Sequence, residues 1–390
     1  MVGKESEETG LDLSIESRCI HLENDHGENR FGAISFPIYQ TATFSHPGLG
    51  QSTGYDYTRM QNPTREQLEK TVAALEKGCD CIAFSSGMAA ITTVMELFGP
   101  GDHLIVDADL YGGTIRLFNN ISQKNGISIT YINCSKEDVK AYIRENTRAV
   151  FIETPTNPMM NVTDIKALAG ITKENRLLLI VDNTFLSPYL QNPLTLGADI
   201  VIHSGTKYLA GHNDTIAGFA VVKDKELSDR LRFLYKTIGA GLSPFDSWLV
   251  LRGIQALAVR MDRAQENAQK LSEWLLSREE VTKVLYPGLK DHPGYEVMKK
   301  QARGFGAMIT FDVRDKEIAQ RLLQNVQLIR FAESLGGAET LLTYPIRQTH
   351  ADVPGDVLEK NGITETTLRM SVGIENVKDL IADLKGAFYG

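Results

Sequence analysis

Short apolar segments that alternate with stretches of helical length dominate the middle of this chain. Seven such segments occur, at residues 81–84, 103–106, 127–132, 149–152, 177–181, 200–202 and 219–222. Strands that are apolar along their whole length have to be buried on both faces, which is typical of parallel sheets with helices on each side. The alternation therefore predicts an α/β fold with a mostly parallel sheet flanked by helices.

The N-terminal part follows another pattern. Residues 11–24 favour one amphipathic helix, whereas residues 31–63 are rich in Gly, Pro, Thr and Tyr and have no sustained periodicity. Helical spacing of apolar residues returns over residues 66–77. We expect an N-terminal arm, residues 1–60, that lies across another surface.

The pattern changes again beyond Pro244. A long helical stretch is expected over residues 245–277, and a last helix over 377–388. Strands are expected between them, at residues 307–313, 327–331 and 368–372. We therefore expect a ligand-binding domain over residues 61–245 and a smaller α+β C-terminal domain over residues 246–390.

Composition excludes several classes of protein. The 390 residues carry a net charge of −8, which does not favour a nucleic-acid partner. No apolar window has the length that crosses a bilayer, and the acidic start lacks a signal-peptide core, so no membrane association is expected. The four cysteines lack a paired spacing, which indicates a reduced, cytoplasmic protein. Cys79 and Cys81 have no second ligand pair nearby, so no metal site is expected.

Polar residues follow the predicted strands at the points where they end. In a mostly parallel sheet these points meet along one edge, where α/β proteins bind their ligands. The residues concerned are 85–88, 107–111, 153–157, 182–183 and 204–207. A polar ring on apolar walls is what a small-molecule site requires, so we expect such a site there.

Lys207 is the candidate nucleophile of this ring. It follows the apolar run 200–202. Partial desolvation of its amine would lower its pKa and so favour the neutral form, which attacks a carbonyl carbon. Two hydroxyl residues, Ser204 and Thr206, precede it and could hold a phosphate. A solvated lysine in a strand-to-helix turn is the alternative that this stretch leaves open.

Three further features point to an aldehyde cofactor with a phosphate and a basic ring nitrogen. Residues 86–88 open a predicted helix, whose free N–H groups bind phosphate, and neither a P-loop nor a dinucleotide glycine motif occurs. Asp182 ends the most apolar strand, where a pyridinium N–H would partner a buried carboxylate unless the residue is a helix N-cap. Tyr111 could stack on a planar ligand or simply pack. With Lys207, these are the groups that pyridoxal phosphate requires.

Six motifs resemble those of one enzyme family. They are residues 57–64 (YTRMQNPT), 84–90 (FSSGMAA), 153–158 (ETPTNP), 181–184 (VDNT), 204–208 (SGTKY) and 368–375 (LRMSVGIE). In this order they resemble the trans-sulfuration enzymes, the Cys/Met-metabolism branch of the fold-type I pyridoxal-phosphate enzymes. That branch includes cystathionine γ-synthase, cystathionine β- and γ-lyase and methionine γ-lyase. The resemblance runs from about residue 30 to the C-terminus.

The resemblance implies roles at the cofactor. Lys207 would bond the cofactor and then carry protons, Asp182 would keep the pyridine nitrogen protonated, and Tyr111 would stack on the ring and take part in catalysis. Asn157 would contact the cofactor hydroxyl and line the substrate site. The residues that match the phosphate cup are Gly87, Met88, Ser204 and Thr206.

The resemblance also implies a substrate clamp and an assembly. Arg369, with Ser334 and Glu333, would bind the substrate, because a planar guanidinium suits a carboxylate. Tyr57 and Arg59 match the pair that reaches the phosphate of a neighbouring subunit. A dimer would then be the smallest active unit and a dimer of dimers the usual assembly.

Residues around the site favour one reaction over others. Glu333 resembles the glutamate that γ-synthases and γ-lyases place near a distal ammonium or leaving group. Methionine γ-lyases typically have a cysteine where this chain has Gly113, and Lys-Asp at positions 235–236, so that activity is disfavoured, as is a non-catalytic cofactor-binding protein. Residues 245–253 (FDSWLVLRG) look more like γ-synthases. We expect a cystathionine γ-synthase that acts on an O-acylhomoserine and a thiol, with a cystathionine γ- or β-lyase, acting on a sulfur amino acid, as the alternative.

Overall fold

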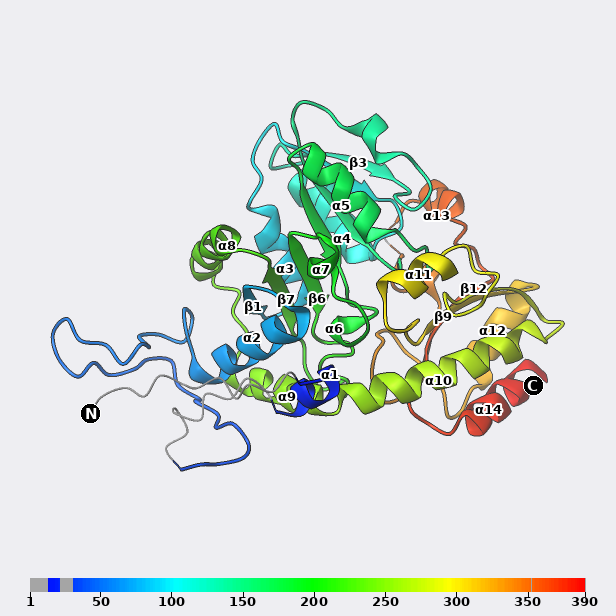
Figure 1. Cartoon of the computed structure of the whole chain (residues 1–390). Helices are drawn as coiled ribbons and strands as arrows, with labels where there is room; N and C mark the ends of the chain where they lie inside the picture. Colours follow the sequence, from blue (N-terminus) through cyan, green and yellow to red (C-terminus); the bar gives the residue numbers. More distant parts are fainter. Residues whose placement is uncertain (1–12, 22–30, 352, 390) are drawn as a thin grey trace.

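A seven-stranded sheet forms the centre of the larger part of the molecule (Figure 1). The computed structural model describes residues 13–21, 31–351 and 353–389. The strand order is β1-β7-β6-β5-β4-β2-β3, and all neighbours among β2 to β6 are parallel. The expected mostly parallel sheet is therefore confirmed. The strands are β1 (Asp80–Phe84), β2 (His103–Asp107), β3 (Ser128–Ile132), β4 (Thr147–Glu153), β5 (Leu178–Asp182), β6 (Ile200–Ser204) and β7 (Gly218–Val222).

The strand β7 departs from this pattern, because it runs antiparallel to both β1 and β6. Residues 205–217 join β6 to β7 and contain no helix. A parallel neighbour needs a crossover, usually through a helix, whereas an antiparallel strand can return directly. This helix-free return begins at the carboxyl end of β6 and carries Lys207.

Helices cover both faces of the large sheet (Figure 1). Successive side chains of a strand point to opposite faces, so Ile180 and Val181 lie in two different buried clusters. The Val181 cluster includes side chains of α2 and α5, and the Ile180 cluster includes side chains of α3, α4 and α8. The elements are α2 (Pro63–Glu76), α3 (Gly87–Met95), α4 (Gly112–Leu117), a π-helical turn (Phe118–Ser122), a 3-10 turn (Val139–Tyr142), α5 (Ile165–Glu174), α6 (Ser187–Leu190), α7 (Pro193–Leu196) and α8 (Lys225–Ile238).

Side-chain caps start most of the longer helices. The Asn62 side chain accepts a hydrogen bond from the Thr64 N–H at the start of α2, where Pro63 also stands at the first position. Ser86 caps α3 in the same way by accepting from the Ala89 N–H. The cap of α3 fixes the turn that follows β1, so the helix start faces the edge of the sheet where ligands bind.

A five-stranded sheet forms the smaller part, with the order β10-β11-β12-β9-β8. Only β10 and β11 are parallel, and the other pairs are antiparallel. With its helices this sheet confirms the expected α+β character. The elements are α9 (Pro244–Gln255), α10 (Leu257–Leu276), β8 (Val281–Leu285), α11 (Tyr295–Gln301), β9 (Met308–Val313), α12 (Lys316–Asn325), β10 (Arg330–Phe331), β11 (Leu341–Thr343), a 3-10 turn (Pro345–Arg347), α13 (Gly355–Asn361), β12 (Thr367–Ser371) and α14 (Val377–Tyr389).

Some expected elements differ from the structure. The single helical stretch over residues 245–277 is wrong, because α9 ends and α10 begins around Ala256. There the Gly253 carbonyl accepts hydrogen bonds from the Ala256 N–H and from the Arg260 guanidinium, so the helical ladder does not continue. The strands β8 and β11 were not expected. In the first expected helix, the described part is α1 (Ile15–Ile20), and residues 11–12 and 22–24 lie outside the described residues.

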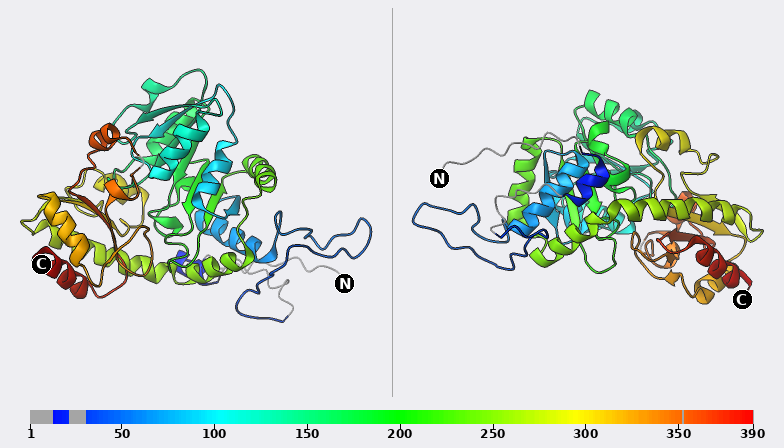
Figure 2. Two further views of the ribbon diagram at one scale, coloured as in Figure 1. Left: turned by 180° about the vertical axis from the view of Figure 1, so that it is seen from behind. Right: turned by 60° about the horizontal axis from the view of Figure 1, so that its bottom comes forward.

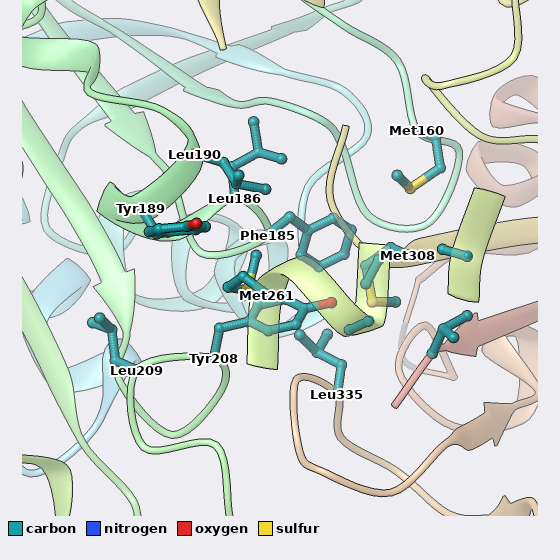
Figure 3. Packing of buried hydrophobic residues seen from close by; sticks show 14 of the residues in the cluster. Met160, Phe185, Leu186, Tyr189, Leu190, Tyr208, Leu209, Met261, Met308 and Leu335 are labelled. Atoms are coloured by element: carbon teal, nitrogen blue, oxygen red, sulfur yellow. The ribbon is translucent and has the colours of Figure 1, made fainter. Parts of the chain in front are cut away.

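The two sheets share one buried core. The cluster that contains Val181 continues into the smaller sheet and includes Met308 of β9 and Leu335 of the loop after β10. Figure 3 shows part of this packing, with Tyr208 near Met261 of the long helix α10 and near Leu335. Tyr208 follows Lys207 directly, so the interface between the two sheets holds the segment that carries this lysine.

Residues 31–62 form an arm that extends away from the body of the molecule (Figures 1 and 2). Its one strand-like contact within the described residues is an isolated bridge between Thr43 and Tyr57. Phe31 and Leu49 are almost fully exposed. Exposed apolar side chains of this kind mark a surface that another protein surface can cover. Across the described residues, no helix combines the length and hydropathy needed to span a membrane.

Candidate active site

A cavity of about 340 Å³ lies at the edge of the large sheet where β1, β4, β5 and β6 end. The loop between β10 and β11, the segment after β11 and the strand β12 close it from the side of the smaller sheet. The lining residues that the sequence predicted are Gly87, Met88, Tyr111, Asn157, Asp182, Ser204, Thr206, Lys207, Glu333, Ser334 and Arg369. The structure thus brings together every predicted site residue except Tyr57 and Arg59.

Lys207 lies on the wall of the cavity, and its amine is held by a residue of the loop that follows β10. Its Nζ donates a hydrogen bond to Ser334 Oγ over 2.9 Å. Burial, assisted by the positive charge of Arg369, lowers the pKa of Lys207 to about 8, and the Glu333 carboxylate opposes this change. A substantial fraction of the amine is therefore neutral near physiological pH, which is the form that attacks a carbonyl carbon and accepts a proton.

Asp182 ends β5 and lines the same cavity. Its Oδ1 accepts hydrogen bonds from the Thr184 N–H over 3.0 Å and from the Thr184 hydroxyl over 2.6 Å. That hydroxyl in turn accepts from the Ser204 N–H, so β5 and β6 are tied together below the cavity. Burial raises the pKa of Asp182. Within the described residues it has no salt bridge, so a cationic N–H from a ligand would stabilise its ionised form.

The start of α3 forms a separate corner of the cavity. A Cβ atom at Gly87 would lie 3.1 Å from the Cα of Ser204, so a glycine allows the helix start to approach the end of β6 closely. The first N–H groups of a helix have no partner within the helix and bind anions. Thr206 lies near this corner and donates from its hydroxyl to the Ala217 carbonyl. The corner has the donors that a phosphate requires.

Arg369 of β12 is a buried cation held by neutral oxygens. Its Nη1 donates to Asn157 Oδ1 over 2.8 Å, and its Nη2 donates to the Ser334 carbonyl over 3.0 Å. The Nη2 also donates to the Thr343 hydroxyl, whereas the Nε has no partner among the described residues. Burial lowers the pKa of Arg369 to about 10. A buried guanidinium that lines a cavity without a salt bridge is suited to an anionic ligand such as a carboxylate.

Glu153 is a site residue to which the sequence interpretation gave no role. It lines the cavity at the end of β4, in register with Asp182 on β5, and its Oε2 accepts a hydrogen bond from the Tyr111 N–H over 2.9 Å. Burial and the nearby Asp182 raise the pKa of Glu153 well above its ordinary value. Both effects favour the neutral form of its carboxyl group. In the sequence, the feature that points to Glu153 is its position at the end of a predicted strand, within the polar ring.

Tyr111 has a partly exposed ring at the cavity. A Cβ atom at Gly113 would lie 2.5 Å from the Tyr111 ring and 3.2 Å from Met88 Sδ. A side chain at position 113 would therefore push the tyrosine out of its present orientation. The other lining residues that the sequence interpretation did not select are Ile91, Thr184, Phe185, Ile216, Leu335 and Thr349.

Tyr57 and Arg59 lie outside the cavity of their own chain. The Arg59 guanidinium is 5.7 Å from the centre of the Tyr57 ring, and its Nη1 donates to the Lys236 carbonyl. Tyr57 is 43% exposed. Both residues stand at the end of the arm, so within one chain they contribute nothing to the cavity.

The residues of the cavity fit pyridoxal phosphate. Asp182 offers a carboxylate without a salt bridge to a ring nitrogen, the start of α3 offers N–H donors to a phosphate, and Lys207 offers an amine with a lowered pKa. Fold and site together define a fold-type I pyridoxal-phosphate-dependent enzyme. More specifically, the chain belongs to the Cys/Met metabolism PLP-dependent enzyme family, whose model matches residues 16–389.

Relatives and solved structures agree on the family and differ in the named reaction. The chain is 47% identical over 377 residues to a cystathionine β-lyase of Lactococcus lactis subsp. cremoris (strain MG1363), covering 96% of this chain and 98% of the relative. It is 50% identical over 374 residues to a cystathionine γ-synthase/O-acetylhomoserine (thiol)-lyase of Bacillus subtilis, covering 96% of each. A crystal structure of cystathionine γ-lyase from Lactobacillus plantarum complexed with L-serine superposes with a TM-score of 0.93 at 42% identity, over 97% of this chain and 99% of the other. The protein is thus a pyridoxal-phosphate-dependent enzyme of the trans-sulfuration family.

Glu153→Gln should leave turnover within about threefold of the wild type, because the amide is uncharged, like the carboxyl form that burial favours, and still accepts the Tyr111 N–H. Glu153→Ala should lower both turnover and affinity for the cofactor by about tenfold, because the Tyr111 N–H loses its acceptor. Steady-state kinetics and cofactor titration check both variants. An equal loss in the two variants would mean that the ionised carboxylate is required.

Proposed function

We propose that this enzyme is a cystathionine γ-synthase, which replaces the γ substituent of an O-acylhomoserine with a thiol. Glu333 carries the proposal: its carboxylate lines the cavity and acts electrostatically on both Lys207 and Arg369. A carboxylate there can attract the ammonium group at the distal end of cystathionine, or assist departure of a γ substituent. The name of the Bacillus subtilis relative that is 50% identical agrees with this choice.

Residues of this chain hold the substrate and move its protons. When bound, pyridoxal phosphate supplies an aldehyde for the substrate amine and a ring that withdraws electrons from the α carbon. Lys207, with its lowered pKa, would take the Cα proton and, in γ chemistry, would pass that proton on to the bound cofactor before it takes one from Cβ. Arg369 binds the α-carboxylate of the substrate. Asn157 and Ser334, which accept hydrogen bonds from the Arg369 guanidinium, assist it.

Residues around the cavity would keep the cofactor oriented. Asp182 would accept a hydrogen bond from the pyridine N–H, and Thr184 holds the carboxylate in place for this task. Tyr111 would stack on the ring, and Asn157 would contact the ring hydroxyl. The corner formed by Gly87, Met88, Ser204 and Thr206 would hold the phosphate.

A cystathionine lyase is the alternative. Elimination needs the same base, ring and carboxylate clamp, and differs in that no thiol adds back. The Lactococcus and Bacillus relatives named cystathionine β-lyase and γ-lyase support it as strongly. Methionine γ-lyase is disfavoured, because this chain has Gly113 where those enzymes typically have a cysteine, and Tyr235-Lys236 where they usually have Lys-Asp.

We also propose a dimer of dimers that works in the cytoplasm. In the arm of residues 31–62, Tyr57 and Arg59 lie outside their own cavity, and exposed apolar side chains such as Phe31 and Leu49 offer a surface that a second copy of the chain would cover. In such a dimer the two residues would reach the phosphate at the neighbour's cavity. The four cysteines form no disulfide, in keeping with a reducing compartment. The large domain would then span residues 61–245 and the small one residues 246–390.

The reaction is tested by supplying two substrate sets to the purified holoenzyme. A γ-synthase forms cystathionine from O-acetylhomoserine or O-succinylhomoserine plus cysteine, with kcat/KM at least about tenfold above that for cystathionine breakdown. Mass spectrometry follows the products of both reactions. Release of pyruvate or 2-oxobutyrate from cystathionine at the higher kcat/KM would instead identify a β- or γ-lyase.

The role of Lys207 is tested by trapping the bound cofactor. Borohydride reduction of the wild type should fix the cofactor on the peptide that contains Lys207, and peptide mass spectrometry should locate it. Lys207→Ala should lose turnover by at least about 10²–10⁴-fold, since the base is removed. Reduction that labels another lysine, or turnover that survives in the variant, contradicts the assignment.

The shared site is tested by mixing two defective subunits. Arg59→Ala and Lys207→Ala should each reduce activity to below about 1% when expressed alone. Co-expressed, half of the dimers are hybrids, and one of their two sites contains Arg59 and Lys207 from different chains, so about a quarter of the sites should be active. If the mixture is no more active than its parents, the arm does not complete a neighbour's site.

A further inference from the structure

His350 is a buried histidine behind the substrate side of the cavity. It lies in the segment of residues 344–351, which follows β11, and it is only 2% exposed. Its neighbour Thr349 lines the cavity. No step described above uses this imidazole.

Both ring nitrogens of His350 have partners. The Nε2 lies 3.1 Å from the Asn157 carbonyl oxygen, and the Nδ1 lies 2.8 Å from the Thr349 hydroxyl. Burial, assisted by the positive charge of Arg369, lowers the pKa of His350 to about 4. The ring is therefore neutral near pH 7, with one donor and one acceptor. Because a carbonyl can only accept, Nε2 carries the proton and Nδ1 accepts from Thr349.

The carbonyl held by His350 belongs to the residue that holds the substrate clamp. The Asn157 side chain accepts from Arg369 Nη1, so the order of contacts is His350 to the Asn157 main chain, and the Asn157 side chain to Arg369. The other Arg369 contacts, with Ser334 and Thr343, come from the smaller sheet's side of the cavity. Asn157 is thus the residue on the large sheet's side that accepts a hydrogen bond from Arg369. His350 in turn fixes the main chain of Asn157.

The same segment packs against the residues that present Tyr111. A Cβ atom at Gly112 would lie only 2.2 Å from the Thr349 carbonyl oxygen, so the two main chains are in close contact. The main chain of Leu110 also interacts with the His350 ring. His350 therefore connects the C-terminal part of the chain to two loops of the large sheet, one before α4 and one after β4.

We propose that His350 is a positioning residue that holds Asn157, and through it Arg369, in the orientation that receives the substrate carboxylate. This inference rests on the proposed role of Arg369 as the carboxylate clamp. A histidine that only fills the core would affect stability or cofactor content. A positioning residue affects affinity for the substrate more than the rate of the chemical step, because the reacting groups Lys207 and Asp182 do not contact it.

Three variants separate these possibilities. His350→Gln places an amide donor near the position of Nε2, His350→Asn reaches only as far as Nδ1, and His350→Phe keeps the ring without hydrogen bonds. With whichever substrate the wild type turns over, the Asn and Phe variants should raise KM about tenfold and change kcat less than about threefold. His350→Gln should keep KM within about threefold of the wild type.

Controls distinguish this inference from the proposed function. His21→Gln alters an exposed histidine at the end of α1 and should change nothing. Arg369→Lys should raise KM, and if it does not, the proposed role of Arg369 is wrong. If Arg369→Lys raises KM while His350→Asn and His350→Phe do not, only the inference about His350 fails. Loss of folding or of bound cofactor in all three His350 variants, seen by circular dichroism and cofactor absorbance, would show a purely structural role and overturn the proposal.

Discussion

The buried guanidinium of Arg369 constrains how the two sheets can sit against each other. It belongs to β12 of the small sheet, yet its hydrogen bonds reach Asn157 after β4 of the large sheet as well as Ser334 and Thr343. A buried cation is costly unless it is hydrogen-bonded, so these neutral oxygens have to stay in place. With no salt bridge to Arg369 among the described residues, the site retains its attraction for an anion.

The same charge shapes the acid–base chemistry of the cavity. Burial and the Arg369 charge both lower the pKa of Lys207, whereas the Glu333 carboxylate raises it. Across the cavity, burial and Asp182 raise the pKa of Glu153 and favour its neutral form. The cavity therefore holds an amine with a lowered pKa and a carboxyl group with a raised pKa, which accepts a hydrogen bond from the Tyr111 N–H. Such opposed shifts within one cavity are typical of enzyme active sites.

Much of the fold and site could be predicted from local patterns. Period and composition indicated the strands up to β7, and the motifs pointed to Lys207 and Asp182, because a residue that follows a buried strand has its place set by that strand. The antiparallel direction of β7 and the break at Ala256 could not be predicted in this way. The break depends on a hydrogen bond from Arg260 to Gly253, and the direction depends on how residues 205–217 return. Glu153 and His350 gained significance only through partners distant in the chain, Tyr111 and Asn157.

The sequence by itself determined the α/β fold class, the family and most residues of the cavity, because each follows from a short run of residues and its spacing. Tertiary structure decided the properties that depend on contacts between residues distant in the chain. It set which charges are buried together, how far their pKa values move, and that the Lys207 amine is held by Ser334, a residue 127 positions away in the chain. It also showed that Tyr57 and Arg59 stay outside their own cavity. The physical reason is that burial and long-range hydrogen bonds exist only once the two sheets have packed together.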